Sequence, residues 1–231
     1  MPERKTMEQS NEVGRGCTTA QEVLAGMPAG EVSPHRPTSQ TLDGCRRCEL
    51  WRNATHGVPG AGPGNARIIV VGEQPGDQED LAGMPFVGPA GHVLDRALIE
   101  AGIARDDVYV TNAVKHFKWE LRGKRRLHKT PAQKEIEACH YWLQGEMNDS
   151  RARVVVTLGA TALKAVLEVK AVSLGKVMGE VLEHDDRKIV PTYHPSYVLR
   201  LREQEEKAQA IKAIVDALKT AEKLAAQHQR K

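Results

Sequence analysis

Short runs of β-branched residues alternate along the chain with segments whose apolar residues follow helical spacing. Ile68-Ile69-Val70-Val71, which ends at Gly72, is typical of a buried strand. The same pattern predicts further strands at 108–111, 154–158, 181–182 and 189–191, and helices at 93–101, 131–147, 160–167 and 203–227. The helix at 131–147 is expected to begin at Pro131 with Thr130 as its cap. Strands that alternate with helices predict an α/β fold with a parallel sheet covered on both faces.

The carboxyl ends of the predicted strands form the expected ligand-binding edge. In open α/β sheets, ligands bind in the crevice beyond these ends. We therefore expect the segments that follow the strands to converge there, namely Gly72-Glu73-Gln74-Pro75-Gly76, Asn112, Gly159 and the loop at His194.

Composition divides the chain into two parts. Residues 1–40 are rich in Pro, Ser, Thr, Gly, Glu and Gln, and predict a disordered tail before a single globular domain over 41–231. No apolar run approaches the roughly 18–20 residues of a membrane span, and the first residues lack the apolar stretch of a secretory signal. We expect a cytoplasmic monomer with no membrane partner.

Positive charge is concentrated although the net charge is only +3. A cluster of this kind can bind phosphates, but charge alone favours a solvated basic loop. The cluster consists of Lys115, Lys118, Arg122, Lys124, Arg125, Arg126 and Lys129.

The spacing of the cysteines indicates a metal site. Structural disulfides are not expected in a cytosolic chain, because that compartment keeps thiols reduced. Cys45 and Cys48 form a C-x-x-C, Cys139 lies far downstream, and Cys17 lies in the predicted tail.

Three loop motifs have both a structural and a functional interpretation. Gly72-Glu73-Gln74-Pro75-Gly76 is either a simple strand-to-helix turn or a turn whose backbone N–H groups approach a ligand. Its glycines do not fit the G-x-G-x-x-G pattern of dinucleotide-binding enzymes. Phe86 is either a core residue or a surface on which a flipped base stacks. In His194-Pro195-Ser196, the histidine can donate a hydrogen bond to a ligand, and the serine can cap a helix or bind a phosphate.

Taken together, these motifs resemble the active-site motifs of the uracil-DNA glycosylase superfamily, most closely its iron–sulfur branch, family 4. The resemblance extends from about Leu42 to Leu201, in the family's order, through Glu73–Gly76, Pro85–Gly88, Thr111–Lys115 and His194–Ser196. It implies a three-layer α/β/α sandwich around a four-stranded parallel sheet, and uracil-containing DNA, single-stranded or double-stranded, as the partner. It also implies catalytic roles for Glu73, Gln74 and His194, and substrate contacts for Gly72, Phe86, Asn112 and Ser196.

In that branch four cysteines hold a 4Fe–4S cluster. Cys45, Cys48 and Cys139 match three of these positions, and the fourth is occupied here by His116. Histidine is an accepted ligand of iron–sulfur clusters, so the resemblance implies Cys45, Cys48, His116 and Cys139 as ligands. Cys17 is the rival for the fourth position, and a zinc ion with three cysteines and one histidine would use the same ligand set.

The segment Lys124-Arg125-Arg126-Leu127-His128 departs from ordinary family 4 members, in which this connection is shorter. It resembles the signature of the UdgX group, whose members become bonded to their DNA. This implies that His128 forms the bond and that Lys124, Arg125 and Arg126 engage the DNA backbone. The charge pattern alone favours a phosphate-binding loop with an incidental histidine. Two competing functions stay open, a turnover glycosylase that releases an abasic site and a non-catalytic iron–sulfur nucleic-acid-binding module.

Overall fold

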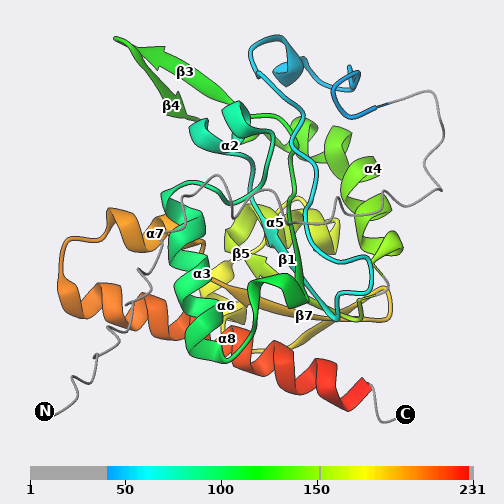
Figure 1. Ribbon diagram of the computed structural model, residues 1–231, viewed down its shortest axis with the longest axis vertical. Coiled ribbons are helices and arrows are strands. Elements are labelled where there is room, and N and C mark those ends of the chain that lie inside the picture. Colours follow the sequence, from blue (N-terminus) through cyan, green and yellow to red (C-terminus); the bar gives the residue numbers. More distant parts are fainter. Residues whose placement is uncertain (1–40, 151, 229–231) are drawn as a thin grey trace, which may run out of the picture. The chain divides into compact units, whose positions relative to one another are not determined.

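The computed structural model describes residues 41–150 and 152–228, so the predicted tail and Cys17 lie outside the described residues. A five-stranded sheet with the order β2-β1-β5-β7-β6 forms its centre (Figure 1). The strands are β1 (Ile68–Gly72), β2 (Val108–Asn112), β5 (Val154–Leu158), β6 (Leu182–His184) and β7 (Arg187–Thr192).

The predicted α/β class is confirmed, and the predicted count of four strands is too low by one. The strands β2, β1, β5 and β7 run parallel, whereas β6 pairs antiparallel with β7 at the edge. The chain reverses between β6 and β7 at Asp185 and Asp186, whose φ angles are 46° and 58°. Positive φ at both central residues is typical of a tight hairpin turn, which adds the antiparallel edge strand.

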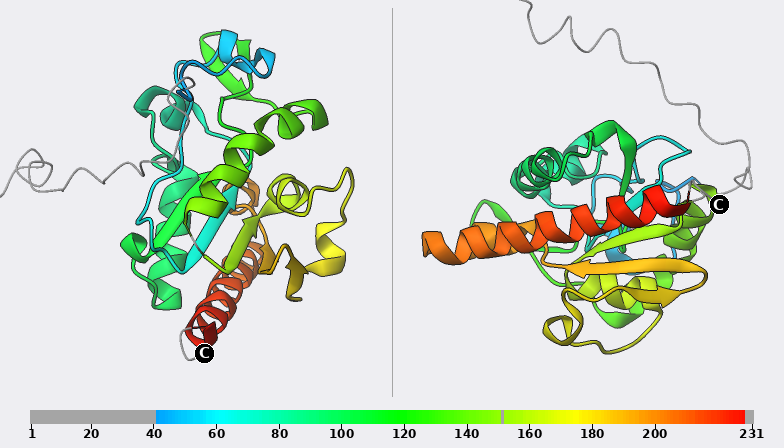
Figure 2. Two further views of the ribbon diagram at one scale, coloured as in Figure 1. Left: turned by 90° about the vertical axis from the view of Figure 1, so that its right-hand side faces the viewer. Right: turned by 90° about the horizontal axis from the view of Figure 1, so that it is seen from below.

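Helices cover both faces of the sheet, which confirms the three layers. Along β1, Ile68 and Val70 face one hydrophobic core, and Ile69 and Val71 face the other. Figure 2 shows α8 lying along one face of the sheet. The first core includes residues of α3 (Pro89–Ala101), α7 (Pro195–Arg200) and α8 (Gln204–His228). The second includes residues of α4 (Gln133–Asp149) and α5 (Gly159–Leu167), and α6 (Leu174–Val177) packs against it.

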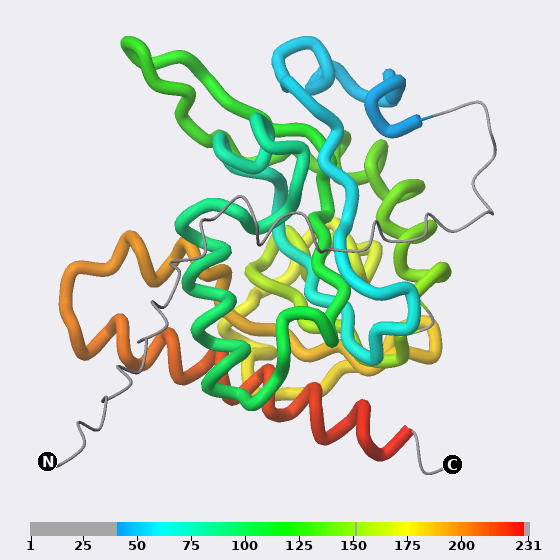
Figure 3. Tube along the Cα trace, in the orientation of Figure 1, coloured from blue at the N-terminus to red at the C-terminus, as the bar shows by residue number. Residues whose placement is uncertain are grey.

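The basic segment forms a β-hairpin rather than a loop. Strands β3 (Trp119–Arg122) and β4 (Arg125–His128) pair antiparallel, and Gly123 takes a φ of 62° in the turn between them. In Figure 3 the hairpin extends from the body beside the segment that contains the short helix α2 (Asp77–Ala82). The remaining elements are the 3-10 helices η1 (Glu49–Arg52) and η2 (Arg105–Asp107).

The predicted start of α4 is wrong by two residues. The helix begins at Gln133 after Ala132, not at Pro131 after Thr130. The Glu135 carboxylate accepts a hydrogen bond from the Ala132 N–H at 2.6 Å, so an acidic side chain in the first turn caps the helix instead of Thr130. Within residues 41–150 and 152–228, no helix combines the length and apolar character needed to cross a membrane.

Candidate active site

Gly72 brings two predicted substrate residues together at the carboxyl end of the sheet. It is paired with Asn112 in the register of β1 and β2. A Cβ atom on Gly72 would lie 2.4 Å from Asn112 Oδ1 and 2.6 Å from Phe86 Cζ, so only glycine fits there. The Asn112 amide and the Phe86 ring, both buried, therefore pack against the same point of the backbone.

The loop that carries Phe86 is fixed in an uncommon conformation. Phe86 has a φ of 57°, in the left-handed region that non-glycine residues rarely adopt. Gly91 allows α3 to pack closely against this loop, since a Cβ at Gly91 would lie 1.8 Å from the Phe86 carbonyl oxygen. The Glu79 carboxylate accepts hydrogen bonds from the N–H groups of Gly76 (3.0 Å) and Gly88 (2.9 Å). Glu79 thereby joins the loop after β1, residues 73–76 (the β1 loop), to the loop of residues 85–88 that carries Phe86. The sequence pattern did not predict this role.

His194 is held as a neutral hydrogen-bond donor. The Ser196 N–H donates to its Nδ1 at 3.1 Å, which places the ring proton on Nε2. Burial lowers the pKa of His194 to about 4, against the opposing attraction of Glu73. Its ring stacks on Phe86 with the centroids 6.2 Å apart. The geometry therefore presents an uncharged Nε2–H group beside the Phe86 ring.

Glu73 and His128, both predicted to be catalytic, lie next to each other. His128 Nε2 is 3.2 Å from Glu73 Oε1, and the Thr161 hydroxyl donates to Glu73 Oε2 at 2.5 Å. Burial alone would raise the pKa of Glu73, but the hydrogen bonds from His128 and Thr161 outweigh it and lower the pKa below its usual value. Glu73 is therefore an ionised carboxylate that orients the half-exposed His128 ring. Thr161, on α5, was not among the predicted residues.

Gln74 is engaged with the base of the hairpin. Its side-chain amide donates to the carbonyl oxygens of Lys118 (3.2 Å) and Lys129 (3.1 Å), and its Oε1 accepts from the Lys118 N–H at 3.1 Å. These bonds join the β1 loop to both ends of the hairpin. Gln74, predicted to take part in catalysis, thus contacts the residue that follows β4, the strand that ends at His128.

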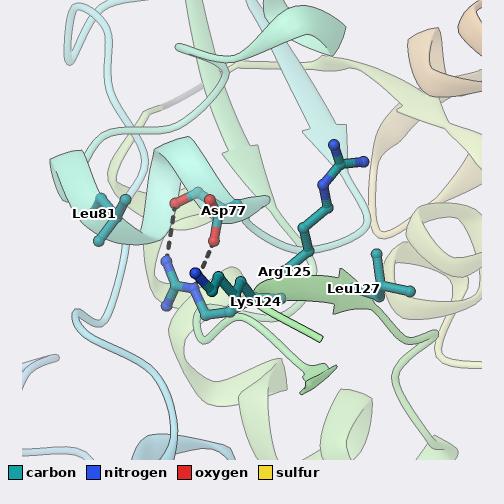
Figure 4. A pocket seen from close by; sticks show the side chains of 6 residues that line it. Asp77, Leu81, Lys124, Arg125 and Leu127 are labelled. Atoms are coloured by element: carbon teal, nitrogen blue, oxygen red, sulfur yellow. Dashed lines mark hydrogen bonds and ion pairs between the residues drawn. The ribbon is translucent and has the colours of Figure 1, made fainter. Parts of the chain in front are cut away.

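The hairpin carries four basic residues, Arg122, Lys124, Arg125 and Arg126, which differ in their surroundings. Arg126 donates to Asp77 Oδ1 at 2.5 Å and Asp80 Oδ2 at 2.6 Å, so two carboxylates already neutralise its charge. Lys124 and Arg125 are exposed. Together with Asp77, Leu81, Arg126 and Leu127 they line an open cavity of about 400 Å³ (Figure 4). Lys124 and Arg125, with the exposed Arg122 of β3, are therefore hairpin cations available to phosphate groups.

The predicted metal ligands come from two distant parts of the chain. Cys48 directly precedes η1, Cys45 lies three residues before Cys48, and Cys139 lies on α4; none of the three is in a disulfide. Cys45 Sγ accepts a hydrogen bond from Trp142 Nε1 at 3.2 Å, and Cys139 Sγ accepts from the Lys115 N–H at 3.5 Å. A hydrogen bond from the Cys139 thiol lowers the pKa of Cys48 to about 6, and the same contact raises the pKa of Cys139.

His116 has the properties of a metal ligand. Its side chain is buried, and Nδ1 has no hydrogen-bond partner among the described residues. Burial also lowers its pKa, so the neutral ring keeps a lone pair for a metal. An orphaned buried nitrogen costs free energy unless something binds it. The residues present therefore fit a group bound by three thiolates and one imidazole.

No three of these four predicted ligand atoms all lie within 4.8 Å of one another. Tetrahedral zinc, with Zn–S bonds of about 2.3 Å, holds its ligand atoms within about 4 Å of one another. In the described part of the chain, only Glu168, His184 and Asp185 form a group of three or more such side chains with ligand atoms within 4.8 Å. The cysteine and histidine set is not such a group.

Comparison with known proteins identifies the family. The model of the uracil DNA glycosylase superfamily matches residues 59–219, which include the β1 loop, Phe86, Asn112, His128 and His194. A type-4 uracil-DNA glycosylase of Thermotoga maritima is 40% identical over 168 residues, covering 72% of this chain and 84% of the relative. A type-4 enzyme of Archaeoglobus fulgidus is 36% identical over 172 residues, covering 70% and 83%. A type-5 uracil-DNA glycosylase of Pyrobaculum aerophilum is 33% identical over 172 residues, covering 68% and 73%. The chain therefore belongs to the uracil-DNA glycosylase superfamily, and its similarity to type-4 members over most of their length places it in family 4.

Proposed function

We propose that this protein is a uracil-DNA glycosylase of the UdgX kind, which excises uracil and becomes covalently linked to the sugar through His128. The observation that carries the proposal is the 3.2 Å contact between His128 Nε2 and Glu73 Oε1. Glu73 directly follows Gly72, against which Asn112 and Phe86 pack. A nucleophile and a carboxylate that can take its proton thus lie beside the residues that recognise the base.

Recognition of uracil is assigned to the buried corner of the site. A base inside the stack is out of reach, so the nucleotide is extruded at a cost of a few kcal/mol. Phe86 offers an aromatic face to the base, and the Asn112 amide both donates to and accepts from its Watson–Crick edge. The His194 Nε2–H group, with backbone N–H groups near Glu73, stabilises negative charge that develops on the uracil oxygens.

The hairpin supplies the contacts to the DNA backbone. Lys124 and Arg125 engage phosphates, which gives salt-sensitive binding without sequence preference. Arg126 is bound to Asp77 and Asp80 and holds the hairpin against α2. The hairpin therefore brings phosphate-binding cations and His128 to the DNA on one rigid element.

Covalent capture follows from the cleavage step. The glycosidic bond breaks, its electron pair leaves with the uracil, and C1′ of the sugar becomes cation-like. One ring nitrogen of His128 donates its lone pair to C1′, and the imidazolium that forms loses its remaining N–H proton to Glu73. In a turnover enzyme a water molecule adds to C1′ instead. Because nothing displaces the imidazole, the adduct persists and turnover stops.

We also propose that Cys45, Cys48, His116 and Cys139 hold a 4Fe–4S cluster. When bound, such a cluster serves a structural purpose by tying the C-x-x-C segment to α4. The buried, unpartnered Nδ1 of His116 supports this residue over Cys17 as the fourth ligand. Iron and sulfide analysis of purified protein tests the assignment. His116→Ala should lower the iron content and Cys17→Ala should not; the reverse result would exchange their roles.

Denaturing gel electrophoresis after mixing with a uracil-containing single-stranded oligonucleotide tests the function. Wild-type protein should give a protein–DNA band that survives denaturation, and His128→Ser should lose that band. His228→Ser, which changes an exposed histidine at the end of α8, is the matched control and should keep it. An abasic product without the band would indicate a turnover glycosylase. Binding without any release of uracil would indicate a non-catalytic module.

A further inference from the structure

Lys115 is a completely buried cation next to the residue that reads the base. Its Nζ donates three hydrogen bonds, to Glu146 Oε2 at 2.6 Å, Thr111 Oγ1 at 2.6 Å and the Asn112 carbonyl oxygen at 2.8 Å. The exposed fractions of the Lys115 and Glu146 side chains are 0% and 2%. All three protons of the ammonium group are therefore used.

Glu146 completes the network from α4. Its Oε1 accepts the Gly60 N–H at 2.8 Å, and its Oε2 accepts the Thr111 hydroxyl at 2.5 Å. A buried ion pair is weak evidence for stability, because an apolar pair of similar volume often stabilises a fold equally well. Directional hydrogen bonds, in contrast, fix the position of what they hold. The group held here is the backbone carbonyl of Asn112.

The same lysine also contacts a predicted cluster ligand. The Lys115 N–H donates to Cys139 Sγ at 3.5 Å. Cys139 and Glu146 are seven residues apart on α4, close to two helical turns, and so lie on one face of that helix. The helix therefore reaches the segment after β2 at two points, one through the Lys115 backbone and one through its side chain.

We propose that Lys115 and Glu146 are positioning residues for base recognition, which hold Asn112 in place through its carbonyl group. The inference rests on the proposed function. Asn112 has little freedom to compensate, since its side chain packs against Gly72 and the Phe86 ring. When its carbonyl is released, the side-chain amide of Asn112, which pairs with uracil, shifts. The Lys115–Glu146 ion pair thereby couples the position of α4 to the geometry of the base pocket.

A double-mutant cycle with Asn112 tests the proposal. Lys115→Met/Glu146→Gln removes both buried charges and keeps the volume. It should lower the single-turnover rate of uracil release about 10- to 100-fold, the loss expected for a shift of up to about 1 Å. In an Asn112→Ala background the same change should lower the rate by less than about twofold, because the pair then has nothing to position. An equal loss in both backgrounds, or no loss in either, would overturn the proposal.

The control is a charge pair at the other end of β1. Arg67 Nη2 lies 2.9 Å from Glu222 Oε1, and Arg67→Met/Glu222→Gln should leave the rate unchanged. Thermal unfolding establishes that each variant is folded. Thr111→Val, which deletes one hydroxyl of the network, serves if the double variant does not fold, and should show the same dependence on Asn112.

Amide hydrogen exchange separates this inference from the proposed function. Absence of uracil release by the wild-type protein would refute the function and leave the positioning role to be measured directly. Thr111→Val should then accelerate exchange at the amides of 113–116 relative to the rest of the sheet. Unchanged exchange there would overturn the positioning role whatever the protein's activity.

Discussion

Gly72→Ala is expected to disable the base pocket while leaving the protein folded. The new methyl group would lie 2.4 Å from Asn112 Oδ1 and 2.6 Å from Phe86 Cζ. Ordinary contacts are about 3.5–4 Å between carbon atoms, so the neighbouring side chains must move by about 1 Å. The backbone is restrained as well, because β1 is paired with β2 as far as Gly72 and with β5 as far as Val71. Overpacking of this kind costs about 1–3 kcal/mol of stability.

The functional loss should be larger than the loss of stability suggests. A displacement of about 1 Å in a positioned group can lower a rate about 100-fold, or about 2.7 kcal/mol of transition-state stabilisation. Single-turnover release of uracil with protein in excess measures this rate, and thermal unfolding measures the stability. Gly64→Ala is the matched control, because a Cβ at Gly64 meets no atom within 4 Å. Release by Gly72→Ala at the wild-type rate would refute the assignment of Asn112 and Phe86 to the base pocket.

Two further predictions concern His194 and Gln74. His194 has a folded-state pKa of about 4, below the ordinary 6.5, so as pH falls from about 6.5 to 4 the unfolded chain binds a proton that the folded chain does not. Stability should therefore fall by up to about 3 kcal/mol across this window, and His194→Asn should lose less in urea titrations over the same range. Gln74→Ala removes three hydrogen bonds at the base of the hairpin, so the covalent adduct should decrease more than uracil release when both are quantified on one gel. Equal decreases of the adduct and of uracil release would show that Gln74 does not position His128.

The sheet and its ligand-binding edge could be predicted because both follow from local patterns. Runs such as Ile68–Val71 have strand character along their whole length, and parallel strands place their carboxyl ends at one edge. Gly72, Asn112 and His194 were thus expected to lie near one another. Gly72 lies against Asn112 and Phe86, and His194 stacks on the Phe86 ring. The edge strand β6 was expected as a strand but not as an antiparallel one. Two aspartates with left-handed backbone conformation, Asp185 and Asp186, give no clear turn signal in the sequence.

The hairpin and its supports depend on contacts between distant residues. Its strands are short and highly charged. Gln74 of the β1 loop holds it through hydrogen bonds, and Arg126 holds it through ion pairs with Asp77 and Asp80. Glu79 and Thr161 are single polar residues in helices, and no spacing distinguishes them from surface positions. Lys115 was assigned to a basic cluster, whereas the structure buries it with Glu146. Charge in a sequence does not reveal whether its partner lies on another element.

Intact mass spectrometry of the protein after reaction with a uracil-containing oligonucleotide is the most direct test of covalent capture by His128. Capture predicts a species with the summed mass of protein and oligonucleotide minus one uracil, and fragmentation should place the attached sugar on His128. Wild-type protein at its unmodified mass beside an abasic oligonucleotide, or a sugar attached to a different residue, would contradict it.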